Sequence, residues 1–389
     1  MSHYFWQGDW PPGVLSREQL KELIVDHQFI QNVSDFEKDA DYSAIDLSLD
    51  SKAWEMVKGS IKPCGPDPVF SQVLRNDQYA RHIDPDTNGY YNLDPSKCYV
   101  FQLSEHFTPQ MYGSYLFGQA TAKSSIGRLD VIARLIIDGQ SRYDYFDSNL
   151  SSSPATGNLY VEIIPISFGI KVRKGVRLSQ LRLFYGCIDD CIITDNEFIK
   201  SIFLGGDDRN IGFLSVNLNN VNIAGIDACA YMAKNCPESN PYIDLSQDTK
   251  LSPVDYWELK PSDSEKKLII ESNNFYLIRS KENISLPSSV AVYARAMDET
   301  LGEMRIHYAG FVHPHFGQER SDGIKGTPLM FEIRGHNADV CLSNGESLAK
   351  LNFYRMSKDA IKRESNNAYK EQELKLSKYF DHWPLKMGS

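Results

Sequence analysis

The sequence predicts a mainly β protein built from two copies of one domain, with only a few short helices. Most of its 389 residues fall in short runs of β-branched and aromatic residues that Gly, Pro, Asp and Ser interrupt. Helical periodicity is rare, and the second half of the chain repeats blocks of the first. The length also suits two domains.

The elements of the first half follow in order along the chain. Ser16 and Gln19 have the spacing of a capping box, which predicts a helix start. The apolar face of this helix follows at helical spacing: Leu20, Leu23, Ile24 and His27. Strands are predicted at 99–104, 114–120, 131–137, 159–165, 169–175 and 178–184.

The duplication is visible when residues 160–184 are aligned with residues 329–353. Glu162 then meets Glu332, and Gly175 meets Gly345. Two upstream blocks repeat in the same order, at 43–49 with 214–218 and at 104–109 with 281–287. We therefore expect one domain over 1–190 and a second over 211–389, with a polar C-terminal tail from about residue 357.

Charge and composition exclude several classes of protein. The formal net charge is −10, which is unfavourable for binding a nucleic acid polymer. Residues 121–185 nevertheless carry nine Lys or Arg against five Asp or Glu, so a small anionic ligand remains possible there. No apolar run is long enough for a membrane span, and no secretory signal is visible. Seven irregularly spaced cysteines favour free thiols and a cytoplasmic location.

The segment KSSIGRLD at 123–130 is the first candidate for chemistry. Ser124 and Ser125 can donate to phosphate oxygens, Arg128 can bind them in a bidentate manner, and Gly127 allows close backbone approach. The same letters also occur in ordinary turns.

Glu162 and Glu332 are the second candidates, since each lies inside an apolar strand. A carboxylate in a strand usually faces solvent, but an inward one has a raised pKa and suits proton transfer near neutral pH. His313 and His315 could ligate a metal, although Pro314 between them favours a turn. The His-x-Glu and Pro-Cys-x-x-Cys motifs of zinc-dependent nucleobase deaminases are absent from the sequence.

These motifs together resemble the dCTP deaminase and dUTP pyrophosphatase superfamily. Its phosphate motif reads roughly Arg-Ser-Ser-x-(Ala/Gly)-Arg-Leu-Gly, and its closing strands read Gly-x-x-Ile-x-Gln-Leu. Nearly all of the chain is similar to the double-length bacterial members, in which two domains are fused. The resemblance implies two distorted, dUTPase-like (β-clip) barrels and a homo-oligomer with sites between domains.

The resemblance also implies hydrolysis of dCTP to dUTP and ammonia, which supplies dUTP for thymidylate synthesis. A glutamate activates the water without zinc or any tightly bound cofactor, and Mg²⁺ accompanies the triphosphate. Glu332 is the expected base and Glu162 the alternative.

Each half of the chain resembles only part of the family's site. The first half matches the phosphate motif, at Lys123, Ser124, Ser125, Gly127 and Arg128. The second half resembles the nucleobase hairpin better, over 309–317, which begins at Ala309 and has His313 where the family usually has Asp. The first half keeps only Arg142 and Asp144 of this hairpin. Residues 368–378 are expected to be too polar to pack as a core element. The resemblance favours a mobile lid over the triphosphate, with Tyr369, Gln372, Lys375 and Lys378, and the alternative is a frayed terminus.

Two other functions remain open from the sequence. One is dUTP pyrophosphatase activity, alone or in a bifunctional enzyme, although the tail lacks the Gly-rich, Arg-containing motif of those enzymes. The other is non-catalytic nucleotide binding, because motif loss in one half is compatible with a sensor or scaffold.

Overall fold

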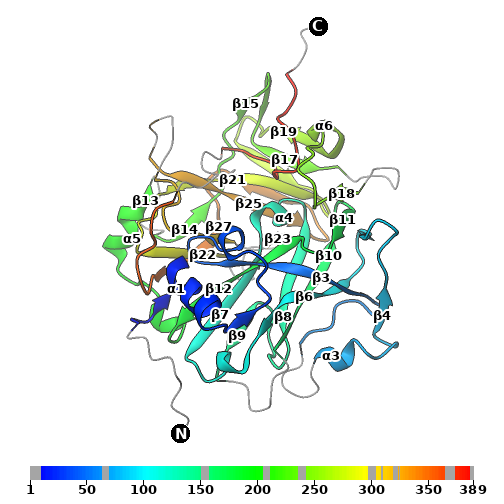
Figure 1. Ribbon diagram of the computed structural model, residues 1–389. Helices are drawn as coiled ribbons and strands as arrows, with labels where there is room; N and C mark the ends of the chain where they lie inside the picture. The colour runs from blue at the N-terminus through cyan, green and yellow to red at the C-terminus, as the bar shows by residue number, and fades with distance from the viewer. Residues whose placement is uncertain are drawn as a thin grey trace.

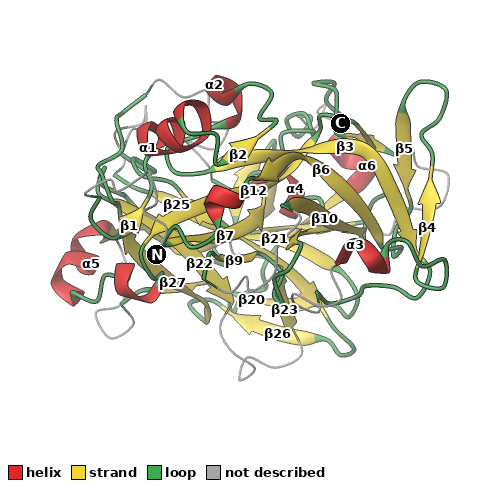
Figure 2. Ribbon diagram, turned by 60° about the horizontal axis from the view of Figure 1, so that its bottom comes forward, coloured by secondary structure: helices red, strands yellow, loops and turns green. Residues whose placement is uncertain are grey.

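The computed structural model describes residues 10–63, 70–149, 157–204, 211–234, 242–296, 304–307, 310–318, 323, 325–363 and 373–385, with the backbone alone for Ala296 and 304–307. Strands fill the body of the molecule, and most helices are short and lie at its margin (Figures 1 and 2). None of the described helices is long and apolar enough to cross a membrane.

The first half of the chain carries most of the short helices. Its strands are β1 (Gly13–Val14), β2 (Ile30–Gln31), β3 (Ile45–Met56), β4 (Ala80–Ile83), β5 (Tyr90–Leu93), β6 (Tyr99–Phe107), β7 (Leu116–Ala122), β8 (Val131–Ile137), β9 (Tyr145–Asp147), β10 (Asn158–Pro165), β11 (Ile170–Arg173) and β12 (Arg177–Tyr185). Its helical segments are α1 (Arg17–Lys21), η1 (Glu22–Asp26), α2 (Phe36–Asp39), α3 (Phe70–Val73), η2 (Pro109–Met111) and α4 (Ser124–Gly127).

The second half follows a connector made of η3 (Asp189–Cys191) and α5 (Asn196–Ile202). Its strands are β13 (Phe203–Leu204), β14 (Phe213–Ser215), β15 (Val221–Ile223), β16 (Ile226–Ala228), β17 (Ala230–Ala233), β18 (Ile243–Asp244), β19 (Trp257–Lys260), β20 (Lys267–Ile270), β21 (Phe275–Ile284), β22 (Val290–Ala296), β23 (Met304–His307), β24 (Phe311–Val312), β25 (Thr327–Gly335), β26 (Val340–Ser343) and β27 (Ser347–Arg355). Its one described helix is α6 (Pro253–Tyr256).

The two halves share one pattern of strand pairing. In the first half, β12 lies between β3 and β7, and β10 lies between β6 and β8. In the second half, β27 lies between β14 and β22, and β25 lies between β21 and β23. The predicted mainly β fold with a duplicated, barrel-like domain is therefore confirmed.

A buried contact between a serine and a glutamate recurs at the equivalent place in both halves. Ser48 donates its backbone N–H and its hydroxyl to the Glu105 carboxylate, at 2.9 and 2.8 Å. Ser215 makes the same two hydrogen bonds to Glu282, at 2.7 and 2.5 Å. Burial raises the pKa of Glu105 to about 7. The two upstream sequence repeats thus correspond to one structural contact made twice.

The N-terminal helix forms as the sequence predicts. The Ser16 side chain accepts from the Gln19 backbone, and the Gln19 side chain accepts from the Ser16 backbone N–H, so the capping box is complete. The Gln19 amide also donates to Ser357 at 2.9 Å, which ties this helix to the far end of the chain.

The two halves are joined by backbone pairing and by a shared apolar core. β18 of the second half pairs in parallel with β11 of the first, with Ile243 opposite Ile170. Phe168 packs on Tyr256 and Trp257, with ring centres 5.6 and 5.4 Å apart. The domain interface is consequently an extension of the interior rather than a contact between two surfaces.

A buried arginine lies at another part of this interface. Arg182 is fully buried on β12 and donates to the backbone oxygen of Val292 at 2.9 Å. Its guanidinium carbon lies 4.0 Å from the ring centre of Phe311, in the hairpin of the second half. Burial lowers the pKa of Arg182 to about 9.

The C-terminal tail is packed into the protein, which differs from the polar, mobile segment expected from its sequence. Four of its side chains are buried in the core shared by both halves: Leu374, Leu376, Tyr379 and Phe380. The apolar residues of this segment are few, yet they enter the core, whereas Lys375 is half-buried and Lys378 is exposed. The expectation that residues 368–378 are too polar to pack is therefore wrong for residues 374–378.

Candidate active site

The phosphate motif forms a tight turn between two strands. The chain leaves β7, makes the single turn of α4 and enters β8 (Figure 1). Backbone hydrogen bonds from Gly127 to Lys123 and from Arg128 to Ser124, at 3.1 and 3.2 Å, close this turn. Ser125 and Arg128 are buried, at 5% and 3% exposure. The turn therefore presents its hydroxyl and guanidinium groups to the interior of the domain interface.

Glu332 reaches this turn from the other half of the chain. It lies on β25, is 7% exposed, and pairs in register with Leu277 on β21 and His307 on β23. A Cβ atom added at Gly127 would lie only 2.2 Å from Glu332 Oε2. The absence of a side chain at Gly127 thus makes room for the carboxylate.

The surroundings of Glu332 favour a carboxyl group that can hold a proton. Burial raises the pKa of Glu332 well above its usual value. The Arg128 charge opposes this shift, and the Asp130 charge adds to it. A base with a pKa closer to neutrality accepts a proton from water and returns it more readily than an ordinary glutamate.

The tail lies over the phosphate motif. The Ser377 hydroxyl donates to the backbone oxygen of Ser125 at 2.7 Å, and Arg128 Nη1 donates to the backbone oxygen of Lys375 at 3.0 Å. Burial lowers the pKa of Lys378, and the nearby Lys123 charge lowers it further. Lys123 itself forms an ion pair with Asp46. The structure thus gathers the lysines of the motif and of the tail at one place.

Three of the predicted site residues, Ala309, Tyr369 and Gln372, lie outside the described residues. The neighbour of the first, Gly310, is described, and a Cβ added to it would lie 3.8 Å from Ser124 Oγ. The hairpin therefore also approaches the phosphate motif.

His313 contacts the first half of the chain rather than a metal site. Its Nδ1 lies 3.2 Å from Ser43 Oγ and its Nε2 lies 3.7 Å from Asp41 Oδ2. Burial lowers the pKa of His313. His315 instead uses its ring nitrogens on the Gln318 side chain and the Ala360 backbone, so the two histidines diverge. In the described part of the chain, no three His, Cys, Asp or Glu side chains are grouped to hold a metal ion.

Glu162 occupies a different environment, although it is the counterpart of Glu332. It is fully buried, and its Oε2 accepts from the Ser60 hydroxyl at 2.7 Å and from the Tyr143 hydroxyl at 3.0 Å. Tyr143 also donates to the backbone of Ile61. The segment after β3 therefore covers Glu162 with residues of its own half, and a phosphate motif is not among the contacts described for it.

Arg142 and Asp144 belong to the same half as Glu162, and the structure does not bring them to Glu332. Arg142 is exposed and stacks on Tyr145, with its guanidinium carbon 5.2 Å from the ring centre. Asp144 is half-buried and accepts from the Leu135 backbone N–H at 2.7 Å. Burial raises the pKa of Asp144 to about 7.

The raised pKa of Asp144 leads to a prediction about stability. The pKa of Asp144 is higher in the folded than in the unfolded chain, so the folded protein binds the extra proton between about pH 4 and pH 7. Stability is therefore lost as the pH rises through this window. Asp144→Asn should match the wild type near pH 4.5 and exceed it at pH 8 by about 1–4 kcal/mol. Urea unfolding of both proteins across this range measures the difference, and parallel pH profiles would contradict the assignment.

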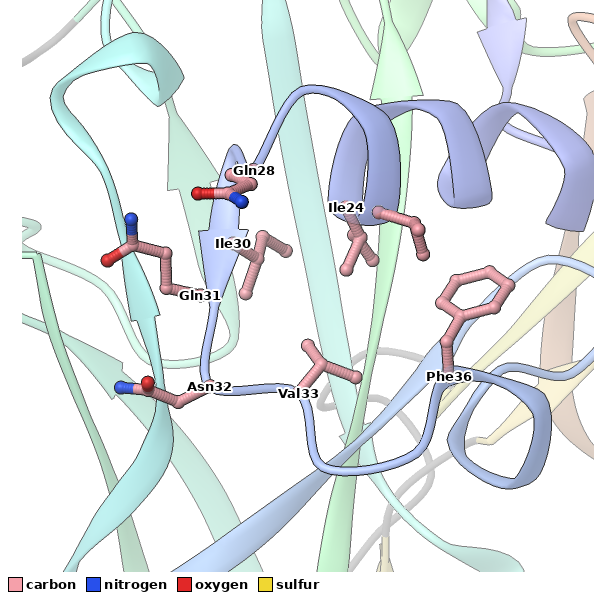
Figure 3. Close-up of a pocket in the computed structure, with 8 residues that line it drawn as sticks. Ile24, Gln28, Ile30, Gln31, Asn32, Val33 and Phe36 are labelled. Atoms are coloured by element: carbon pink, nitrogen blue, oxygen red, sulfur yellow. The ribbon is translucent and has the colours of Figure 1, made fainter.

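A separate hollow lies in the first half, beside the chain from η1 to α2 (Figure 3). The side chains of Ile24, Val33 and Phe36 lie toward one another there. The complete lining is Ile24, Val25, Gln28, Ile30, Gln31, Asn32, Val33 and Phe36. None of these side chains is ionisable or nucleophilic, so the hollow offers no group for proton transfer.

Two residues of the site region were missed in the sequence. Asp130 and Arg334 form an ion pair across the domain interface, next to the α4 turn and to Glu332. Asp130 was visible as the last letter of KSSIGRLD, and Arg334 lies two positions after Glu332. The one available signal was that Asp130 and Arg334 carry opposite charges and lie close in sequence to the two predicted parts of the site, KSSIGRLD and Glu332.

Both halves of the chain match known family models. Residues 11–187 match the N-terminal domain of 2′-deoxycytidine 5′-triphosphate deaminase (DCD), and residues 199–380 match the C-terminal domain. The crystal structure of 2′-deoxycytidine 5′-triphosphate deaminase from Agrobacterium tumefaciens is similar, with a TM-score of 0.77 and 25% sequence identity. That match covers 90% of this chain and 97% of the other. A search of curated proteins finds no match.

Proposed function

This chain belongs to the 2′-deoxycytidine 5′-triphosphate deaminase family, and on that premise we propose that its active site is the junction between the α4 turn and Glu332. The chain deaminates dCTP hydrolytically to dUTP and ammonia, and so supplies dUTP. One observation carries the assignment of the site: the Glu332 carboxylate of one half lies against Gly127 in the phosphate motif of the other.

In the proposed mechanism, Glu332 acts as both base and acid. Its carboxylate takes a proton from water, and the resulting hydroxide attacks C4 of cytosine to form a C4–O bond. The electrons of the C4–N3 double bond move to N3, which takes the proton from the carboxyl group. The Glu332 carboxylate then carries the proton of the new C4 hydroxyl to the exocyclic amine, so the C4–N bond breaks, ammonia leaves and the C4 carbonyl of uracil forms. Its buried position keeps the pKa of Glu332 high enough for both directions of transfer.

The triphosphate is assigned to the α4 turn, on the opposite side of the junction from Glu332. Ser125 and Arg128 would supply a hydroxyl and a guanidinium. Lys123, Lys375 and Lys378 are proposed to add positive charge, since Lys378 lies near Lys123 and the Lys375 backbone bonds to Arg128. Ser124 is proposed to donate to the phosphates as well, and the hairpin residues Ala309 and His313 are proposed to border the nucleoside part. We propose Mg²⁺ as the charge partner of the phosphates, without a dedicated protein site.

The experiment that tests this function separates the possible products. Purified protein is incubated with dCTP and Mg²⁺, and dCTP, dUTP, dUMP and ammonia are quantified over time. Equal amounts of dUTP and ammonia support deamination alone. Accumulation of dUMP would instead show an added pyrophosphatase activity, and dCTP binding without ammonia would support a non-catalytic role.

The raised pKa of Glu332 predicts the pH dependence of turnover. The base must be ionised to accept a proton from water, so kcat should fall as the pH drops through the pKa of Glu332. The midpoint of this fall, the acid limb of the kcat–pH profile, should lie above pH 4.3, since the pKa of an ordinary glutamate is about 4.3. Ammonia release at saturating dCTP from pH 5.5 to pH 9 measures it. A kcat that stays constant down to pH 5.5 would contradict the assignment.

The proposal also excludes a catalytic zinc ion. The base is a carboxylate, and His313 and His315 direct their rings to different partners. Purified protein should therefore contain much less than one zinc per chain by mass spectrometry of the metal. A zinc chelator should leave turnover unchanged when Mg²⁺ is in excess. Stoichiometric zinc that is required for turnover would return attention to the two histidines.

Two further properties are proposed for this chain. A cytoplasmic location is supported by the described cysteines, which are free thiols: Cys98, Cys187, Cys191, Cys229 and Cys341. A homo-oligomer is supported by the resemblance of the chain to the dCTP deaminase and dUTP pyrophosphatase superfamily.

A further inference from the structure

Asp130 and Arg334 form a buried ion pair that spans the domain interface. Arg334 Nη2 bonds to Asp130 Oδ2, and Arg334 Nε lies 3.4 Å from Asp130 Oδ1. Ser167 donates to Asp130 Oδ2 at 2.5 Å and accepts from Arg334 Nη2 at 2.8 Å. The Asp130 side chain is fully buried and the Arg334 side chain is 16% exposed. The pair is thus held by several groups, unlike an exposed surface ion pair.

Each member of this pair is joined by a short stretch of backbone to a different half of the active site. Asp130 follows Arg128 by two residues, and its backbone N–H donates to Gly127 O at 2.9 Å. Arg334 follows Glu332 by two residues on β25, so both side chains lie on the same face of the strand. The ion pair therefore fixes the distance between the α4 turn and the carboxylate.

The backbone conformation at Asp130 also indicates a role for the carboxylate at this position. Its φ angle is +57°, in the left-handed region where glycine is the default residue. Aspartate tolerates this region better than most residues, but at some cost. The cost is offset at this position by the contacts with Arg334 and Ser167.

We propose that Asp130 and Arg334 are positioning residues for deamination, which hold the Glu332 carboxylate against the α4 turn and set the charge around it. This inference rests on the proposed role of Glu332 as the base. Neither residue is required to touch the substrate, because both act through the position and the ionisation of Glu332.

The charges around Glu332 make the inference testable through pH profiles. Arg128 and Asp130 face it from the α4 turn, and Arg334 lies two positions along its own strand. The neighbouring strands place Leu277 and His307 opposite it in register. Removing the Asp130 charge should therefore move the acid limb of kcat to lower pH. Removing the Arg334 charge should move it to higher pH.

The experiment compares Asp130→Asn, Arg334→Met and the double variant with the wild type. The kcat, KM and acid limb for dCTP are measured together with the thermal midpoint. We expect kcat to fall by about 10-fold to 10²-fold in each single variant, with a smaller change in KM, because a misplaced base slows the chemical step. The two acid limbs should shift in opposite directions, and the double variant should return close to the wild-type limb. Arg334→Lys should retain the wild-type limb and part of kcat.

Two further variants keep the result interpretable. Asp130→Gly removes the carboxylate while suiting the positive φ angle, so it remains informative if Asp130→Asn folds poorly. Arg177→Met is a matched control, since Arg177 pairs with Asp39 with side-chain exposures of 19% and 0%. It should lower stability without moving the acid limb.

Unmoved acid limbs and unchanged kcat in both single variants would overturn the inference and leave the pair a purely structural role. A failure of the proposed function looks different. In that case Glu332→Gln itself would keep turning over dCTP.

Discussion

Glu332→Gln is expected to abolish dCTP deamination while leaving dCTP binding largely intact. The glutamine has the shape of the glutamate, so the space beside Gly127 stays filled. It cannot accept a proton from water, and loss of general acid–base catalysis typically costs ~10²–10⁴-fold in rate. Ammonia release under saturating dCTP measures turnover, and isothermal titration with dCTP measures binding.

Glu162→Gln is the matched control for this experiment. Glu162 is the repeat-related residue, but Ser60 and Tyr143 of its own half cover its carboxylate. We expect this variant to keep deaminating dCTP. An active Glu332→Gln variant together with an inactive Glu162→Gln variant would show that the base lies in the first half.

Phe380→Ala is expected to lower the free energy of unfolding by about 3–5 kcal/mol. Phe380 is 4% exposed, and its ring centre lies 5.3 Å from that of Tyr256 and 5.9 Å from that of Trp257. Truncation leaves a cavity in the core that both halves share. Because the same segment hydrogen-bonds to Ser125 and Arg128, dCTP turnover should also fall.

Leu385→Ala provides the control within the same tail. Leu385 is 81% exposed, so its truncation should change stability by less than about 0.5 kcal/mol. Urea unfolding of both variants measures the difference, with activity assayed well below the transition. Equal stability of Phe380→Ala and the wild type would show that the tail is a detachable terminus, as its polar sequence suggested.

The strands were predictable because their periodicity is strong. The run predicted at 131–137 is β8, and the run predicted at 159–165 begins one residue late relative to β10. In such runs every second side chain is apolar and faces the core. This alternation can be read from a few consecutive residues. The match of Glu162 with Glu332 was equally readable, because duplicated domains preserve spacing.

The packed tail could not be predicted in the same way. Leu374 and Leu376 are separated by a lysine, and Tyr379 and Phe380 stand among charged and polar residues. So short a pattern does not distinguish a buried segment from a solvated one. Its burial depends on the core that both halves share, which exists only after both have folded.

The site was partly predictable for a related reason. The resemblance split it between KSSIGRLD and Glu332, and the structure places these segments together. The ion pair of Asp130 with Arg334 joins residues 204 positions apart, and no local pattern links them. Likewise, the cover over Glu162 comes from the segment around Ser60, which carries no recognisable motif.

The parallel pairing of β11 with β18 has a consequence for how the activity responds to dilution. A junction between separate subunits is lost when mass action favours dissociation. Here one polypeptide carries both Glu332 and the α4 turn. The effective concentration of Glu332 at the α4 turn is therefore set by the chain itself. Dilution of the enzyme should therefore not separate the two sides of this junction, and the specific activity should not fall for that reason. For the same reason, two defective copies, one lacking Glu332 and the other lacking Arg128, have no intact junction to share, so mixing them does not restore function by complementation.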